Sequence, residues 1–404
     1  MQDVLAGIRV VEVAAWTFVP ISGAVLAEWG ADVIKIEHPE TGDPQRGLVS
    51  SGLVPGGDGV NFMFEIPNRG KRSVGLDIST DDGRALLYRL VATADVFVTN
   101  HLPEVRRRLG IDLDQIRAVN PDVVYVRGSG LGQRGPQTHR GGFDGATFWG
   151  RAGLAMAFTE PGAPWPTDQR PAFGDVMGGL TIAGGIAAAL VRRERTGTPS
   201  VVDVSLLGMG MWALAPDITS SKLYEGLELP TFDRDSMPNP LVGTYPTRDG
   251  RFIILLLLQA DRFWPDLCAH LDRPDLLDDP RFVDAGARYE HRAECIEVLR
   301  EIFRSRDYAD WVARLDTLKG VWAPLQTPIE VHDDPQALAN GYLERITAAS
   351  GTEFAVPANP VQFDETPPAV RHAPDHGEHT DEVLLELGLT YDEIIEHKVS
   401  GAVL

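Results

Sequence analysis

The sequence has few cysteines, a shortage of cations and no long apolar segment, and each shortage excludes a class of protein. The 404 residues include two cysteines, Cys268 and Cys295, with no CxxC pair and no His/Cys cluster at zinc-ligand spacing. We therefore expect neither a disulfide framework nor a structural metal, and a reducing compartment fits. The longest apolar runs, such as 252–258, are too short to span a bilayer, and the N-terminus lacks the pattern of a signal peptide. These absences predict a soluble, unprocessed, cytoplasmic protein.

The charge balance is strongly acidic. There are 37 Lys and Arg residues against 58 Asp and Glu, which gives a formal net charge of −21 at pH 7. An acidic balance argues against nucleic acid and anionic membranes as partners. An anionic ligand would need a local cluster of cations or backbone N–H groups.

Familiar nucleotide-binding and hydrolytic motifs are also missing. Gly128-Ser129-Gly130 follows a strand-like run, as a dinucleotide fingerprint does, but Gln133 occupies the third glycine position and Pro136 follows. The chain has no GxxxxGKS loop, HExxH pair or GxSxG elbow. Nucleotide hydrolysis, zinc proteolysis and α/β-hydrolase chemistry therefore lack support, and nicotinamide binding remains only as an alternative class.

What is present is an alternating pattern. Over the first two hundred residues, short β-branched runs alternate with amphipathic segments, which predicts helices on both faces of a mostly parallel sheet. The expected strands are 8–13, 32–36, 95–99, 122–126, 200–204 and, further on, 252–258. The expected helices are 22–29, 81–94, 175–195, about 260–272, 287–304, 307–317 and 381–387. Residues 38–70 are predicted to form a long loop with a binding role, and prolines within 215–245 indicate a linker into a second unit.

The segment 173–179 places a lone carboxylate, Asp175, at the start of a helix of small residues. A helix N-cap is the plain structural interpretation. A cap needs no glycine neighbours, however, whereas Gly174, Gly178 and Gly179 would leave the carboxylate open to a ligand and bring N–H groups near a developing oxyanion. The helix dipole would keep Asp175 ionised, as a nucleophile requires. Both interpretations stay open at this point.

Blocks along the whole chain match one family in its own order. They are LAGIRVVEV, LAEWGADVIKIEHPETGDPQR, NRGKRSVGLDI, ADVFVTN, RRRLGIDLDQIRAVNPDVVYVRGSGLG, GDVMGG, TGTPSVVDVSLL, RFWPDLCAHLDRPDL, VWAPLQTPIEVHDDPQ and HGEHTDEVLLELG. On these blocks the sequence resembles the class III CoA-transferase family, also called CaiB/BaiF. That family includes formyl-CoA, carnitine and bile-acid CoA-transferases, with alpha-methylacyl-CoA racemase as a relative.

The resemblance implies an α/β fold with a Rossmann-like large domain built from both chain ends, a smaller inserted α+β domain and an interlocked homodimer. The corresponding ranges are 1–215 for the first part of the large domain, 216–245 for a linker, 246–328 for the small domain and 329–404 for the return into the large domain. It also implies that Asp175 is catalytic, attacking an acyl-CoA thioester to form a mixed anhydride and then an aspartyl-CoA thioester. Coenzyme A and acyl-CoA are then substrates, together with a free carboxylic acid, and neither a permanently bound cofactor nor a metal is expected.

The resemblance also assigns CoA-binding positions. Leu76 falls where the family lines the adenine pocket, and Asn100 and Arg108 match positions near the nucleotide. His101 stands where the family usually has Phe, and His38 where an Arg is common, so the phosphate contacts are expected to be rearranged. The candidate replacement cations are Arg46, Arg69, Lys71, Arg72 and Arg106, although a solvated basic face explains each equally well.

Two alternatives to a transferase are weighed on the residues. A racemase needs acid/base groups on both sides of the α-carbon, but the Gly-His-Asp triplet of the racemase relatives reads Gly142-Phe143-Asp144 here, and the nearest histidine, His139, lies in a predicted loop. A non-catalytic acyl-CoA-binding protein would not need Asp175. The stretch 238–245 lacks the glycine run of oxalate-type transferases, so we expect an apolar acyl pocket. Its candidate lining residues are Trp16, Phe18, Phe143, Asp144, Phe148, Trp149 and Met177.

Overall fold

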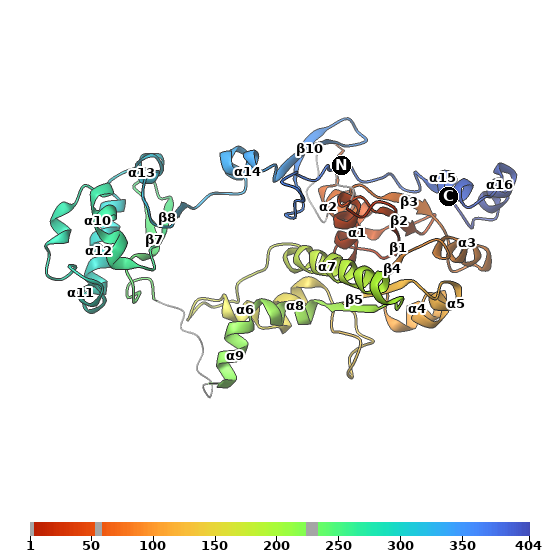
Figure 1. The fold of residues 1–404 in the computed structure, drawn as a ribbon, viewed down its shortest axis with the longest axis horizontal. Coiled ribbons are helices and arrows are strands. Elements are labelled where there is room, and N and C mark those ends of the chain that lie inside the picture. The colour runs from red at the N-terminus through yellow and green to blue at the C-terminus, as the bar shows by residue number, and fades with distance from the viewer. Residues whose placement is uncertain (1–3, 53–58, 224–232) are drawn as a thin grey trace. The chain divides into compact units, whose positions relative to one another are not determined.

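The computed structural model describes residues 4–52, 59–223 and 233–404. The chain divides into two compact units, one of Met1–Leu227 with Pro335–Leu404 and one of Glu228–Asp334. Figure 1 shows the fold of both units. We describe each unit by itself.

The larger unit is built around one sheet. Its elements before the second unit are β1 (Arg9–Val13), α1 (Phe18–Glu28), β2 (Asp32–Glu37), η1 (Pro44–Gly47), α2 (Phe62–Asn68), β3 (Arg72–Gly75), α3 (Asp81–Val91), β4 (Val96–Thr99), α4 (Pro103–Leu109), α5 (Leu113–Val119), β5 (Val124–Ser129), η2 (Gly145–Arg151), α6 (Leu154–Ala157), α7 (Phe173–Thr196), β6 (Val201–Ser205), α8 (Leu206–Ala213) and α9 (Ala215–Leu223). After the second unit follow α14 (Pro335–Ala339), β10 (Leu343–Thr347), β11 (Glu353–Pro357), α15 (Thr380–Glu386) and α16 (Tyr391–Val399).

The six-stranded sheet has the order β3-β2-β1-β4-β5-β6, and every pairing in it is parallel. This is the order of a classic dinucleotide-binding fold, in which the chain reverses direction across the sheet between β1 and β4. Ligands of such sheets bind outside the carboxyl ends of the strands at that point. The expected parallel α/β architecture is therefore present.

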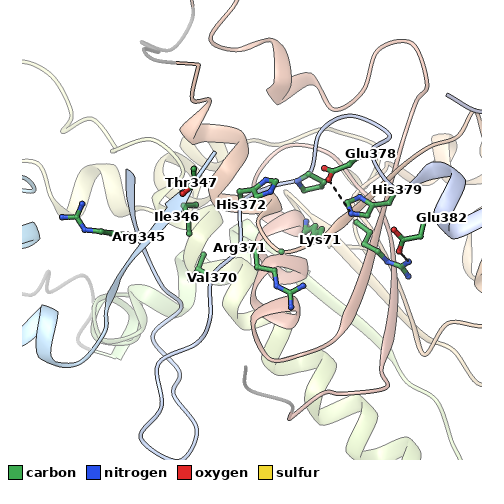
Figure 2. Close-up of a pocket in the computed structure, with 13 residues that line it drawn as sticks. Lys71, Arg345, Ile346, Thr347, Val370, Arg371, His372, Glu378, His379 and Glu382 are labelled. Carbon is green, nitrogen blue, oxygen red and sulfur yellow. Dashed lines mark hydrogen bonds and ion pairs between the residues drawn. The ribbon is translucent and has the colours of Figure 1, made fainter. Parts of the chain in front are cut away.

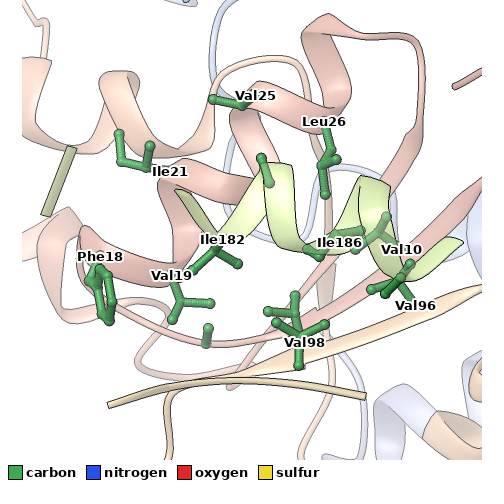
Figure 3. Packing of buried hydrophobic residues seen from close by; sticks show 14 of the residues in the cluster. Val10, Phe18, Val19, Ile21, Val25, Leu26, Val96, Val98, Ile182 and Ile186 are labelled. Atoms are coloured by element: carbon green, nitrogen blue, oxygen red, sulfur yellow. The ribbon is translucent and has the colours of Figure 1, made fainter. Parts of the chain in front are cut away.

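Apolar residues cover both faces of the sheet. On one face, α1 and α7 pack side by side over the strands, and Figure 3 shows Ile182 and Ile186 of α7 near Val10, Val96 and Val98. The other face is covered by α3, α5, α15 and α16, whose buried residues from the C-terminal segment are Val383, Leu384 and Ile394. The large unit thus joins segments from both ends of the chain in one core.

Glycines allow α7 to lie directly against α1. A Cβ atom on Gly178 would overlap the ring of Phe18, and one on Gly179 would overlap the side chain of Ile21. These glycines serve close packing of two helices, whereas Gly184 on the same helix has open space around it.

Helix α7 has 24 residues and is the one helix in the described ranges that is long and apolar enough to cross a membrane. The sequence predicted that no segment is long and apolar enough to span a bilayer. The glycines and alanines of α7 raise its mean hydropathy, and core helices of soluble proteins pass the same test, so the finding is weak evidence for a membrane span.

The second unit is a small α+β domain. It contains β7 (Val242–Pro246), β8 (Phe252–Leu256), α10 (Ala260–His270), η3 (Pro274–Leu277), α11 (Ala285–Glu290), α12 (Arg292–Phe303), α13 (Tyr308–Leu315), β9 (Trp322–Pro324) and η4 (Glu330–Asp333). Its three strands form an antiparallel sheet in the order β7-β8-β9. Both cysteines are buried in its core as free thiols.

The predicted elements are present with shifted ends, and four differences stand out. The helix predicted over 287–304 is two helices, α11 and α12. The predicted linker 216–245 contains most of α9 and the start of β7, and its residues 224–232 lie outside the described ranges. The loop predicted over 38–70 includes η1 and α2, and its residues 53–58 also lie outside them. Strand β3, helix α16 and several shorter elements, among them α5, α8, β7, β9 and the β10–β11 pair, were not predicted.

Candidate active site

A hollow of about 510 Å³ lies at the carboxyl ends of β1, β2, β3 and β4. The residues that line it are 13–16, 36–38, 42–44, 76–79, 100–102, Val105 and Leu109. Each segment directly follows a strand or lies in the adjoining loop or helix, because parallel strands deliver their carboxyl ends to one edge of a sheet. The sequence identified only some of these residues, although the strand ends themselves pointed to the rest.

Four of the expected CoA-binding residues line this hollow. Leu76 is buried at its wall, and His38 and His101 stand at the ends of β2 and β4. Burial, together with nearby cations, lowers the pKa of His101, which favours a neutral ring at pH 7. Asn100 also lines the hollow, but its amide donates to the carbonyl of Ala15 at 2.6 Å and accepts from the Ala15 N–H at 3.2 Å. Asn100 therefore shapes the loop after β1.

The remaining expected CoA contacts, Lys71, Arg72 and Arg108, do not line the hollow. The Nζ atom of Lys71 is buried and lies 2.7 Å from Glu12, and burial lowers its pKa to about 8. Arg72 begins β3, at the opposite end of that strand from the hollow, where it pairs with Asp32 at 2.7 Å and with Glu386 at 2.7 Å. Figure 2 shows Lys71 at a second hollow of about 580 Å³ near the start of β3.

The other proposed replacement cations are also engaged. Arg46 pairs with Glu37 at 2.7 Å and Arg106 with Asp112 at 3.0 Å. Arg69 pairs with buried Glu28 and donates to a backbone carbonyl at 2.7 Å. Arg108 differs from them, because its exposed guanidinium on α4 has no hydrogen bond or ion pair with any residue that the structure describes. Of the cations predicted from the sequence, Arg108 is the one left available to a phosphate.

The N-terminus of α7 is anchored from a distant segment. The buried carboxylate of Asp144 accepts the N–H of Gly174 at 3.0 Å and the N–H of Asp175 at 3.3 Å through Oδ2. Its Oδ1 is buried without a hydrogen-bond partner among the residues described. The Gly174 N–H, expected to be open to an oxyanion, is therefore already occupied in this structure.

Asp175 lies in the first turn of α7 and is not its N-cap. The N-cap is Ala172, in a left-handed conformation with φ 58°, and Asp175 is half-buried. No described residue donates a hydrogen bond to its carboxylate. Burial raises the pKa of Asp175 to about 7, and the charge of Asp144 adds to the rise. The sequence predicted that the helix dipole would keep Asp175 ionised, whereas desolvation and a second carboxylate favour its neutral form.

Aromatic side chains lie at the hollow and on the first turns of α7. Trp16 lines the hollow and packs edge-on against Phe143 with ring centroids 5.6 Å apart, and Phe143 is 65% exposed. Phe173 and Met177, on the first turns of α7, are each about half exposed. Of the other expected pocket residues, Phe18 and Phe148 are buried in the core, and Trp149 stacks on Phe158. Among the residues described, no group of three or more His, Cys, Asp or Glu is placed to hold a metal ion.

The fold is a parallel α/β sheet with a hollow at its strand ends, and comparison with known proteins gives its family. The family model described as "CoA-transferase family III" matches residues 5–380. The chain is 32% identical to (R)-2-hydroxy-4-methylpentanoate CoA-transferase of Clostridioides difficile over 99% of both chains. It is 30% identical to cinnamoyl-CoA:phenyllactate CoA-transferase of Clostridium sporogenes, over 98% of this chain and 96% of that one. A crystal structure of a CaiB/BaiF family protein from Brucella suis superposes with a TM-score of 0.81 at 29% identity, covering 95% of this chain and 99% of that one.

The chain therefore belongs to CoA-transferase family III, as its sequence blocks predicted. It is an enzyme that transfers coenzyme A.

Proposed function

We propose that Asp175 is the nucleophile of this CoA transfer and that the hollow at the ends of β1 to β4 holds the nucleotide part of CoA. The observation that carries the proposal is the half-buried carboxylate of Asp175, to which no described residue donates a hydrogen bond, while its backbone N–H is anchored by Asp144. A carboxylate without donors retains its nucleophilicity once it is ionised.

The proposed reaction keeps the energy of the thioester throughout. The Asp175 carboxylate attacks the acyl-CoA carbonyl, the C–S bond breaks, and a mixed anhydride and CoA thiolate result. The thiolate attacks the aspartyl carbonyl and releases the donor acid, which leaves an aspartyl-CoA thioester. The acceptor carboxylate then attacks the aspartyl carbonyl of that thioester, the C–S bond breaks, and a second mixed anhydride and CoA thiolate result. The thiolate attacks the acyl carbon of the acceptor, which forms the new acyl-CoA and releases the Asp175 carboxylate.

The nucleotide would enter along the strand ends. Leu76 offers an apolar wall for the adenine, and the unpaired guanidinium of Arg108 offers a charge-assisted contact to a phosphate. His38 and His101 would face the nucleotide in place of the Arg and Phe that are common in the family, and the lowered pKa of His101 favours a neutral ring there.

We infer that the acyl group is apolar and of moderate size. Exposed aromatic and thioether side chains beside Asp175, among them Phe143, Phe173 and Met177, favour such a group. Two of the relatives are named for acids with a branched aliphatic or an aromatic side chain and a hydroxyl group. A 2-hydroxy acid is accordingly the first class of acceptor to test.

We further propose an interlocked homodimer that works in the cytoplasm, with domain borders near those predicted from the sequence. Apolar side chains exposed on α7 and α8 support a covered surface, in particular Val176, Val191, Met211 and Trp212. A second copy of the chain is the occupant that the family resemblance implies.

The test is CoA exchange between acyl-CoA donors and free acids, followed by mass spectrometry with wild type, Asp175→Ala and Asp175→Asn. We expect exchange by the wild type to fall at least roughly 10³-fold in both variants, and a CoA adduct trapped on Asp175 only in the wild type. Asp114→Asn, which changes an exposed aspartate in the first turn of α5, is the matched control and should exchange normally. Exchange by Asp175→Ala at the wild-type rate would refute the nucleophile assignment.

A further inference from the structure

Two buried ionised side chains hold the loop between β1 and α1 from beneath. The Nζ atom of Lys35 donates to the carbonyl oxygen of Ala14 at 2.9 Å, and Oδ1 of Asp43 accepts the N–H of Trp16 at 3.3 Å. The same two side chains form an ion pair, with Nζ and Oδ2 2.8 Å apart and side-chain exposures of 0% and 1%. Lys35 and Asp43 thus fix the backbone on either side of Ala15.

This loop has a conformation that needs support. Trp16 has φ of 67°, in the left-handed region that a bulky residue rarely adopts. Such a conformation is strained and persists where the surroundings over-determine it. The next residue is also held, because the hydroxyl of Thr17 accepts a hydrogen bond from the side-chain amide of Gln45 at 2.7 Å.

The ion pair belongs to a balanced buried cluster. Lys35 also lies 3.2 Å from Glu12, and Glu12 lies 2.7 Å from Lys71, so two positive and two negative side chains compensate one another. Burial alone would lower the pKa of Lys35, but the neighbouring carboxylates hold that pKa above its usual value. Buried ion pairs add little net stability compared with apolar residues of the same size, which makes a role in placing the loop the more specific explanation.

We propose that Lys35 and Asp43 are positioning residues that hold residues 14–16 in the left-handed turn presenting Trp16 to the hollow, and so set the affinity for CoA. Lys35 is fully buried, Asp43 is almost fully buried at the lining of the hollow, and both act through the backbone that they bind. This inference rests on the proposed CoA site, and the experiment below separates the two.

The test variant is Lys35→Met/Asp43→Asn, which removes one charge of each sign and leaves Glu12 paired with Lys71. The asparagine retains an oxygen that can accept the Trp16 N–H. The matched control is Arg193→Met/Asp95→Asn, which removes an ion pair of 2.6 Å between α7 and the segment just before β4, at the opposite end of that strand from the hollow. Leu76→Trp, which fills the hollow, tests the site itself.

The measurements are the dissociation constant of CoA by isothermal titration calorimetry, KM and kcat for acyl-CoA, and hydrogen exchange of a peptide covering residues 14–17. In the test variant we expect a CoA dissociation constant about tenfold higher, a larger change in KM than in kcat, and faster exchange in that peptide. The control should retain the wild-type dissociation constant. If the test variant does not fold, Asp43→Asn alone keeps the volume and the acceptor oxygen, and should show the same change in KM to a smaller degree.

The outcomes separate the two proposals. If Leu76→Trp abolishes CoA binding while the folded test variant binds CoA as tightly as wild type, Lys35 and Asp43 are not positioning residues. If the test variant has a lower melting temperature but an unchanged CoA dissociation constant, Lys35 and Asp43 stabilise the fold only and are not positioning residues. If Leu76→Trp binds CoA normally, the proposed CoA site is wrong, and this inference fails with it.

Discussion

The carboxylate of Asp144 accepts the backbone N–H of Asp175 at 3.3 Å, so a second acidic side chain contacts the first turn of α7 although 31 positions separate the two residues in the sequence. The arrangement fixes the backbone of the proposed nucleophile and at the same time opposes its ionisation. Burial and the charge of Asp144 raise the pKa of Asp175 to about 7. Near neutral pH, the carboxyl group of Asp175 is therefore close to its own pKa.

This relationship predicts a pH dependence. Attack requires the ionised carboxylate, so kcat/KM for acyl-CoA should rise with pH and level off above about 7. In Asp144→Asn the rising limb should move to lower pH, because one cause of the raised pKa is removed, while burial, the larger cause, keeps it above that of an ordinary aspartate. A pH–rate profile of both enzymes is the measurement. An unmoved limb in Asp144→Asn would show that the rise does not report Asp175.

A second prediction concerns the unpaired guanidinium on α4. Arg108→Met should raise the KM for acyl-CoA about tenfold if the side chain contacts a phosphate, since hydrogen bonds to charged groups contribute roughly 1.5–3 kcal/mol. The effect should be absent with pantetheine thioesters, which lack the nucleotide. Arg107→Met, at the neighbouring exposed position, is the control. Equal KM values for the two variants would show that Arg108 does not contact the bound acyl-CoA.

A third prediction concerns the contact of α1 with α7. Gly178→Ala and Gly179→Ala should each destabilise the protein by about 1–3 kcal/mol, because the added methyl group overlaps Phe18 or Ile21. Gly184→Ala, on the same helix with open space around it, should be neutral or stabilise by up to about 1 kcal/mol. Thermal unfolding followed by circular dichroism compares the three. A loss of stability in Gly184→Ala equal to the other two would contradict close helix packing as the cause.

A fourth prediction concerns racemisation. By the family resemblance, Phe143 falls where the racemase relatives have the histidine of their Gly-His-Asp triplet, and it lies against Trp16 with ring centroids 5.6 Å apart. The enzyme should therefore incorporate no deuterium from heavy water at the α-carbon of a 2-methylacyl-CoA. Nuclear magnetic resonance of the recovered thioester checks this, and steady uptake that disappears in His139→Ala would identify His139 as a displaced base.

The sequence predicted most of the sheet because its strands are apolar, β-branched runs buried on both faces. It missed β3, an edge strand of 4 residues that begins with the arginine of a surface ion-pair network. It also missed α16, although Thr390 and Glu393 form a capping box that marks the start of that helix.

Side-chain partners were the least predictable part of the site. Lys71 was a reasonable candidate for a phosphate contact, but its partner Glu12 lies 59 positions away, and nothing local in the sequence reveals that pairing. The same holds for Asn100 and Ala15, which only the adjacency of β1 and β4 brings together. By contrast, Asp175 could be singled out because its signal, a carboxylate among helix-opening glycines, is local.

The two-segment construction of the large unit bears on how the chain reaches its native state during synthesis. Val383, Leu384 and Ile394 complete the apolar layer over one face of the sheet. While the ribosome is still translating the small unit, that layer lacks these residues and the edge of β3 lacks the hydrogen bond from the N–H of His379. The small unit has a hydrophobic core of its own, whereas the layer over the sheet is complete only once residues 379–394 are present. Conditions that slow translation late in the message should therefore prolong the time in which an open sheet edge is exposed to aggregation.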